Sequence, residues 1–164
     1  MNPIDLEKKN KPRPDLIPFA ILAVDVSPLL RDLAKFAARP RSGEYHDLIG
    51  TVCRMLRTHR YALYLEVGRV LQYGYQKHGE CTWRIAGTNQ SLPQTHYASA
   101  VRHALEYLSD PDAVEEGSQI PVIYHFVAQV MIIFDLMNNP PSGSGNDGRW
   151  EVGYLYNDEI PETV

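Results

Sequence analysis

Basic and imidazole side chains stand out in two places along the chain. Arg102 and His103 are adjacent, and Lys77 and Trp83 lie in a segment rich in glycine and aromatic residues, 73–84. A guanidinium can clamp a phosphate, an ammonium can neutralise one, and an indole can stack on a base. An imidazole can act as a ligand or a proton donor. Together these residue types indicate a site that handles a nucleotide.

Each of these residues also has a purely structural interpretation. Arg102 and Glu106 are four residues apart, so on a helix they share a face and could simply pair with each other. A single histidine on a helix, such as His103, is often only a half-buried structural residue. The order of these residues along the chain therefore carries more weight than any one of them.

A second polar group interrupts the most apolar stretch of the sequence, residues 120–137. His125 and Gln129 are four residues apart, and Asp135 follows. Burying polar groups costs free energy unless they find partners. We therefore expect either a hydrogen-bonded network inside the core or a bound ligand at this place.

Carboxylates that could hold a metal occur at Glu66 and in the acidic run 110–116, which includes Glu116. Mg²⁺ prefers hard oxygen ligands, and these residues are the candidates for it. The alternatives are an ordinary solvated helix face for Glu66 and a solvated loop for the acidic run.

Composition excludes several classes of protein. The net charge of −4 argues against a partner that is polymeric nucleic acid, and the sequence contains no phosphate-binding GxxxxGK[ST] loop, GxGxxG, GxSxG or HExxH motif. Cys53 and Cys81 are far apart, which predicts free thiols in a reducing compartment and argues against zinc. The polar N-terminus and the interrupted apolar stretch predict no signal peptide and no membrane span, hence a cytoplasmic protein.

Apolar residues recur at helical spacing through most of the chain and predict an all-α fold, a bundle of about five helices. Ser27 followed by Pro28 is a typical helix start, with serine as the N-cap. Residues 1–15 are predicted to be extended, 16–137 to form the nucleotide-handling domain, and 138–164 to form a flexible Gly/Pro/Ser loop and tail in which 150–156 is a short strand or a docked tail. The predicted helical segments are 16–26, 27–40, 44–59, 61–76, 94–108 and 120–136.

Four blocks of the sequence, in order, resemble the phage-type dATP/dGTP diphosphohydrolase N-terminal domain family. The blocks are residues 11–18 (KPRPDLIP), 66–83 with Gly74, Lys77 and Trp83, 97–103 ending in Arg102 and His103, and 118–133 with Pro121 and His125.

This resemblance implies a relative of the all-α nucleoside triphosphate pyrophosphohydrolases, in bacteriophage acting in the host cytoplasm. Such an enzyme converts a deoxypurine triphosphate to its monophosphate and pyrophosphate with Mg²⁺ or Mn²⁺ as cofactor. The roles implied are metal binding by Glu66 and Glu116, phosphate neutralisation by Lys77, Arg102 and Arg13, ligand orientation or proton relay by His103 and His125, and a wall for the purine by Trp83.

The sequence departs from the family pattern at several positions. Gly117 stands where the family has glutamate, Val122 where it has histidine, and Gln129 where it has asparagine. A helical region near 27–60 is inserted relative to the family. Two alternatives therefore stay open: a nucleotide-binding module that does not hydrolyse its ligand, and a helical interaction protein. In the latter the inserted helices supply a partner surface or hold a homo-oligomer together.

Overall fold

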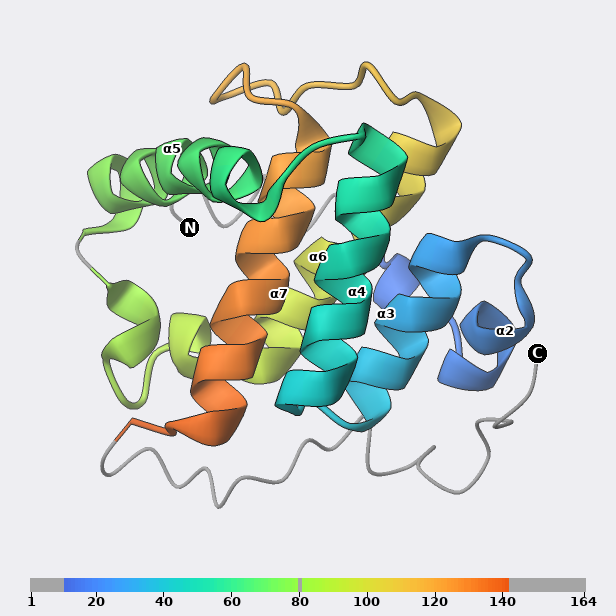
Figure 1. Cartoon of the computed structure of the whole chain (residues 1–164). Coiled ribbons are helices and arrows are strands. Elements are labelled where there is room, and N and C mark those ends of the chain that lie inside the picture. Colours follow the sequence, from blue (N-terminus) through green and yellow to red (C-terminus); the bar gives the residue numbers. More distant parts are fainter. Residues whose placement is uncertain (1–10, 80, 142–164) are drawn as a thin grey trace.

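The computed structural model describes residues 11–79 and 81–141, and every long element within them is an α-helix (Figure 1). The prediction of an all-α bundle of about five helices is confirmed, since the described residues form five helices of eleven residues or more and one short helix. In chain order the elements are the 3₁₀ turn η1 (Pro14–Leu16), α2 (Phe19–Val24), α3 (Pro28–Ala38), α4 (Ser42–Leu56), α5 (Arg60–His78), the 3₁₀ turns η2 (Thr82–Arg84) and η3 (Asn89–Ser91), α6 (Pro93–Ser109) and α7 (Val122–Asn138).

Helix α7 is the centre of the fold. Its side chains are apolar on most sides, and such a helix is stable in water only when other elements surround it. In the structure α6, α5 and α4 all pack against it, with α6 making the most extensive contact. α7 and α4 run side by side in Figure 1, and α2 and α3 complete the far side of the core.

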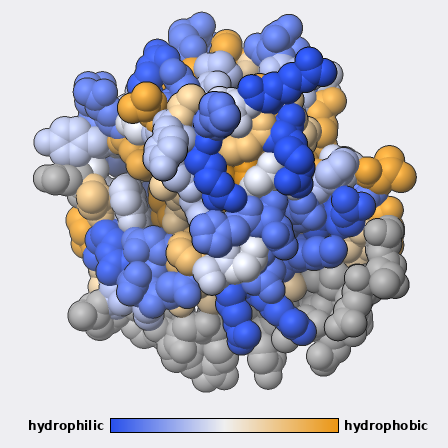
Figure 2. Space-filling model, in the orientation of Figure 1, coloured by the Kyte–Doolittle hydropathy of each residue, from blue (hydrophilic) through white to orange (hydrophobic). Residues whose placement is uncertain are grey.

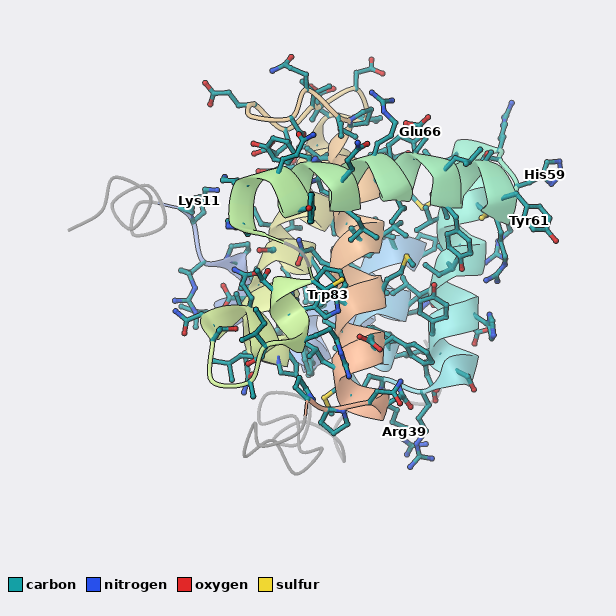
Figure 3. The ribbon with its side chains drawn as sticks, turned by 90° about the vertical axis from the view of Figure 1, so that its left-hand side faces the viewer. Lys11, Arg39, His59, Tyr61, Glu66 and Trp83 are labelled. Atoms are coloured by element: carbon teal, nitrogen blue, oxygen red, sulfur yellow. The ribbon has the colours of Figure 1, made fainter. Side chains whose placement is uncertain are left out.

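Helix α5 lies across one end of α7 rather than alongside it (Figures 1 and 3). Only Leu63, Val67 and Val70 are buried on α5, and their spacing of four and three residues marks a single narrow face. A crossing helix touches its neighbours over a short length. The remainder of α5 is therefore free to form one wall of a cavity.

The predicted start of α3 is confirmed in position but not in chemistry. Ser27 has an extended backbone and Pro28 is the first helical residue, as expected. However, the Ser27 hydroxyl makes no capping hydrogen bond and is buried with no partner among the described residues. The Ser27 N–H instead donates to the Asp25 carboxylate at 2.8 Å, which fixes the turn before the helix.

The apolar faces of residues 27–60 are buried within this chain. Leu33 and Phe36 of α3 and Leu48 and Val52 of α4 are fully shielded from solvent, and α3 and α4 pack against each other and against α6 and α7. The sequence alone allowed these broad apolar faces to serve as a surface for a partner. In the structure they contribute to the same core as α6 and α7.

Hydrophilic side chains cover most of the face shown in Figure 2, and apolar ones form small separate groups on it. No helix in the described part of the chain is long and apolar enough to cross a lipid bilayer. Of the predicted N-terminal segment, residues 11–13 precede η1, whereas residues 1–10 and the tail beyond 141, with its predicted strand, lie outside the described residues.

Candidate functional site

A cavity of about 1370 Å³ opens where α5 crosses the pair formed by α6 and α7. Residues 11–16 and the turns η2 and η3 complete its walls. Seven of the eight residues predicted from the sequence to form the site line this cavity. They are Arg13, Lys77, Trp83, Arg102, His103, Glu116 and His125.

Glu66 is the eighth predicted residue, and it does not line the cavity. Its carboxylate pairs with Arg69 one turn along α5, at 2.9 Å. Figure 3 shows Glu66 on the opposite side of α5 from Trp83. Glu66 and Glu116, the two predicted metal ligands, are therefore not brought together in one cavity.

Two pairs of polar side chains connect α6 to α7 across the floor of the cavity. We call His103 and His125 the imidazole pair, because their ring centroids are 5.4 Å apart. We call His96 and Gln129 the amide pair, because Nδ1 of His96 and the amide atom placed as Oε1 of Gln129 are 2.6 Å apart. His103 follows His96 along α6, whereas its partner His125 precedes Gln129 along α7. The two helices are therefore antiparallel, and the two pairs lie at different points along them.

At the imidazole pair, Glu106 binds His103 and not Arg102. The Glu106 carboxylate is 3.0 Å from Nδ1 of His103, and among the described residues Arg102 makes no ion pair or hydrogen bond. The structural interpretation of Arg102, a surface pair with Glu106, is thus wrong. Arg102 lines the cavity with its guanidinium available to an anion.

The other member of the imidazole pair, His125, is held neutral at physiological pH. Burial lowers the pKa of His125 to about 4, and the neighbouring His103 adds to this effect. The ring remains hydrogen-bonded, because Nε2 is 2.8 Å from the Ser118 hydroxyl. Ser118 also accepts the Ile120 N–H at 3.1 Å, so the loop before α7 fixes the orientation of the His125 ring.

The protonation of His125 makes the stability of the fold depend on pH. In the unfolded chain the His125 pKa returns to about 6.5, so between pH 6.5 and pH 4 the unfolded state binds a proton that the folded state does not. The free energy of unfolding should therefore decrease as the pH is lowered, by about 2 kcal/mol from pH 7 to pH 5 for this group. His96, whose pKa is also lowered, contributes in the same direction.

Urea unfolding of the wild type and of His125→Asn at pH 7, 6 and 5 measures this dependence. The variant should lose less stability than the wild type over the same range. An equal loss in both proteins would show that His125 takes up its proton in the folded state as readily as in the unfolded chain.

Glu115 supplies a carboxylate at the same end of the cavity. Its Oε2 accepts the Ser118 N–H at 2.8 Å. Burial opposes ionisation, but the hydrogen bonding from Ser118, together with the charge of Lys77, outweighs it and holds the Glu115 pKa below its usual value. Glu115 therefore faces the cavity as a carboxylate anion.

Gly117 leaves space for a neighbouring tyrosine. A Cβ atom at position 117 would overlap the Tyr73 hydroxyl and would lie 3.4 Å from Oε2 of Glu115. The glycine thus allows α5 and the loop before α7 to approach each other closely. The departure from the family pattern at this position has a physical basis in this chain.

Replacing Gly117 by alanine should destabilise the protein by about 1–3 kcal/mol, the usual cost of an overpacked contact. Removing the hydroxyl with Tyr73→Phe should restore most of that loss, because the ring carbon is at an ordinary 3.5 Å from the added Cβ. Denaturant unfolding of the two single variants and the double variant gives the coupling energy. Additive effects would mean that Tyr73 is not the group that excludes a side chain at position 117.

The amide pair is buried at the other end of the cavity. His96 bridges two groups, with Nδ1 2.6 Å from the Gln129 amide and Nε2 2.7 Å from the backbone oxygen of Gln90. Burial lowers the pKa of His96 despite both contacts. The polar residues that interrupt the apolar stretch 120–137 thus have partners, as a core network requires, and Gln129 and His125 line the cavity as well.

Trp83 is fixed at the amide end of the cavity by Asp135. The indole Nε1–H donates to the Asp135 carboxylate at 3.1 Å, and Arg84 binds the same oxygen at 3.1 Å. Asp135 follows Gln129 along α7, so Trp83 lies on the side of the amide pair that is farther from the imidazole pair. An indole held by its N–H keeps its ring faces for apolar contact.

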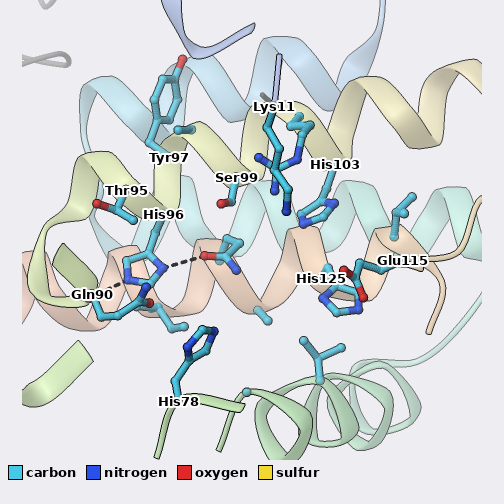
Figure 4. Close-up of a pocket in the computed structure, with 18 of the residues that line it drawn as sticks. Lys11, His78, Gln90, Thr95, His96, Tyr97, Ser99, His103, Glu115 and His125 are labelled. Carbon is cyan, nitrogen blue, oxygen red and sulfur yellow. Dashed lines mark hydrogen bonds between the residues drawn. The ribbon is translucent and has the colours of Figure 1, made fainter. Parts of the chain in front are cut away.

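Positive charge collects at the imidazole end of the cavity. Lys77 makes no ion pair among the described residues, and its Nζ lies 6.0 Å from the centre of the Tyr73 ring. Arg13 is less available, because two hydrogen bonds of 2.9 and 2.8 Å tie its guanidinium to Asp15. Figure 4 shows Lys11, His103, His125 and Glu115 together at one end, and His96, Gln90 and Thr95 at the other.

The carboxylates in the cavity only partly fit a metal ion. Among the described residues, no group of three or more His, Cys, Asp or Glu side chains could hold a metal by itself. Mg²⁺ is often bound by only one or two carboxylates, with substrate phosphates and water completing its shell. Glu115 and Glu116 meet this smaller requirement, since both line the cavity.

Sequence reasoning missed the partners that orient the site. Ser118, Glu106 and the Gln90 backbone oxygen orient three of the four histidines that line the cavity, His125, His103 and His96. Lys11 adds a charge near Glu106. The spacing between Glu106 and His103 was visible in the sequence. Nothing in the sequence marked Ser118 or the backbone of Gln90.

The model of the family described as dATP/dGTP diphosphohydrolase, N-terminal, matches residues 51–146, which is more than half of the chain. The matched region contains α5, α6 and α7 and thus every part of the cavity except residues 11–16. Comparisons with curated proteins and with solved structures found no match.

Proposed function

The chain belongs to the dATP/dGTP diphosphohydrolase N-terminal family, and from this premise we propose that it hydrolyses a deoxypurine nucleoside triphosphate to the monophosphate and pyrophosphate. The observation that carries the proposal is the division of the cavity. Unpaired cationic side chains lie at the imidazole end, and neutral amide groups with an indole lie at the other end. That arrangement suits a ligand with an anionic tail and an uncharged ring.

In the proposed reaction, Arg102 and Lys77 bind the phosphates and neutralise the charge that develops as pyrophosphate leaves. Water adds across the bond between the α- and β-phosphates: its oxygen bonds to phosphorus, and the bridging bond breaks. In this proposal His103 takes the proton from that water, a role supported by the contact of its Nδ1 with Glu106. His125 is neutral and serves to orient the ligand.

A divalent metal, Mg²⁺ or Mn²⁺, would be held by Glu115 and Glu116 together with the phosphates. When bound, such an ion polarises a phosphoryl oxygen and lowers the pKa of a bound water. Glu66 has no place in this assignment, because its carboxylate faces Arg69 outside the cavity.

A second candidate function is nucleotide binding without hydrolysis. The observation that favours it is that the described residues form no group of three metal ligands. A degenerate relative of the family would keep the cavity and its cations while losing the chemistry.

The test is to incubate the full chain with each dNTP and Mg²⁺ and to identify the products. Deoxypurine monophosphate and pyrophosphate in equal amounts are the expected result, and Glu115→Gln should slow their formation strongly. Glu66→Gln is the matched control, a carboxylate outside the cavity, and should react as the wild type does. Saturable binding without products would select the binding module, and absence of both would overturn the proposal.

A further inference from the structure

The hydrogen bonds of His96 fix the direction in which the Gln129 amide must point. A neutral imidazole carries one N–H and one lone pair. The Gln90 backbone oxygen can only accept, so Nε2 of His96, at 2.7 Å from it, carries the hydrogen. Nδ1 is then an acceptor. The Gln129 atom at 2.6 Å from it is placed as Oε1, but opposite an acceptor this atom must be the NH₂ group, so we assign the amide in the reversed orientation.

This leaves the carbonyl oxygen of Gln129 as its second polar atom. The two ends of a glutamine amide have the same shape, so the hydrogen-bond network decides which is which. Gln129 is only partly buried and lines the cavity, and its second amide atom is not one of the buried unpartnered atoms of the described residues. That atom is therefore accessible to a ligand in the cavity.

We propose that the Gln129 carbonyl oxygen recognises the nucleobase by accepting a hydrogen bond from an N–H group on its edge. The inference rests on the proposed function and adds the residue that selects the base. The ligand class is a purine with an N–H donor: the 6-amino group of adenine, or the ring N–H and 2-amino group of guanine. His96 is a positioning residue, because it acts only by holding the amide.

The spacing of the cavity supports this assignment. His96 and His103 are seven residues apart on α6, which places the amide and imidazole pairs about 10 Å apart along the helix. This separation is comparable with the span of a nucleotide from its base to its phosphates. A triphosphate bound by Arg102 and Lys77 would thus place its base beside Gln129 and Trp83.

Because His96 beside it is uncharged, the Gln129 carbonyl oxygen alone can distinguish a base with an N–H donor from one without. Burial lowers the pKa of His96, so the amide is not reversed by an imidazolium at neutral pH. A base without an N–H donor would leave the Gln129 oxygen desolvated and unpaired, which costs free energy. Discrimination should therefore appear as weaker binding of such a base and not as a change at the phosphates.

The test uses calorimetric titration of the full chain with three probes. These are the α,β-methylene analogue of dATP, the corresponding analogue of unsubstituted purine deoxyribonucleotide, which has no N–H on its base, and inorganic tripolyphosphate. The wild type should bind the adenine analogue about tenfold more tightly than the unsubstituted purine. Gln129→Met, of similar length but without an acceptor, should abolish that ratio and leave tripolyphosphate binding unchanged.

Two further variants separate recognition from structure. Gln129→Glu keeps an acceptor and should keep a preference for the adenine analogue, whereas His96→Phe frees the amide to rotate and should reduce the preference. A wild type without any preference, or a Gln129→Met variant that weakens all three probes equally, would overturn the inference while leaving the proposed function intact. Failure of the wild type to bind either nucleotide would instead overturn the proposed function.

Discussion

Replacing Arg102 by alanine is expected to lower kcat/KM for the deoxypurine triphosphate by about 100-fold, with little change in stability. Loss of one charge-stabilising donor at a reacting phosphate typically costs a factor of this size. The reason is that Glu106 binds His103, which leaves the Arg102 guanidinium unpaired in the cavity. Steady-state release of pyrophosphate measures the effect.

Arg69→Ala is the matched control for this variant. Arg69 is also a helical arginine, but it binds Glu66 on the exposed side of α5 and does not line the cavity. Removal of an exposed ion pair changes stability by less than about 1 kcal/mol and should leave kcat/KM unchanged. Equal losses in both variants would show that net charge, and not the position of Arg102, controls the activity.

Gly74→Phe should block the cavity without damaging the fold. Gly74 lines the cavity, and a Cβ atom placed there meets no other atom within 4 Å. The ring would occupy the space of the ligand. Binding of the α,β-methylene analogue of dATP should therefore weaken at least tenfold, since forcing extra atoms into filled space costs about 1–3 kcal/mol. Stability should stay level or rise, since glycine inside a helix costs about 0.5–1 kcal/mol relative to alanine.

Gly68→Phe provides the control on the same helix. Gly68 is also a helical glycine of α5 with no atom within 4 Å of an added Cβ, but it does not line the cavity. This variant should bind the analogue as the wild type does. Undiminished binding by Gly74→Phe would mean that the nucleotide occupies another part of the molecule.

Most of the fold could be predicted because its helices bury regular apolar faces. The predicted segment 61–76 becomes Arg60–His78, and 94–108 becomes Pro93–Ser109, with boundaries close to proline and loop residues. The capping of α3 could not be predicted, because the serine before Pro28 can be satisfied in several ways and here Asp25 accepts its N–H. The crossing of α5 over α7 could not be predicted either. The spacing of apolar residues shows which face of a helix is buried, but not the angle at which two helices cross.

The site was predictable as a set of residues but not as a set of partners. Residue type and order brought seven of eight side chains to one cavity. Glu106 could reach Arg102 or His103 with nearly equal ease along α6, and the packing of the imidazole pair against α7 decided between them. The helical period alone did not decide which side of α5 carries Glu66. In the structure only a narrow face of α5 is buried, and Glu66 pairs with Arg69 outside the cavity.

A crystal structure of the full chain with the α,β-methylene analogue of dGTP tests the central claim most directly. The claim is that one cavity between α5, α6 and α7 holds the whole nucleotide in a single direction. The expected electron density places the phosphates beside Lys77 and Arg102, and the guanine between Trp83 and Gln129. A nucleotide bound outside this cavity, or bound with its base at the imidazole pair and its phosphates at the amide pair, would contradict it.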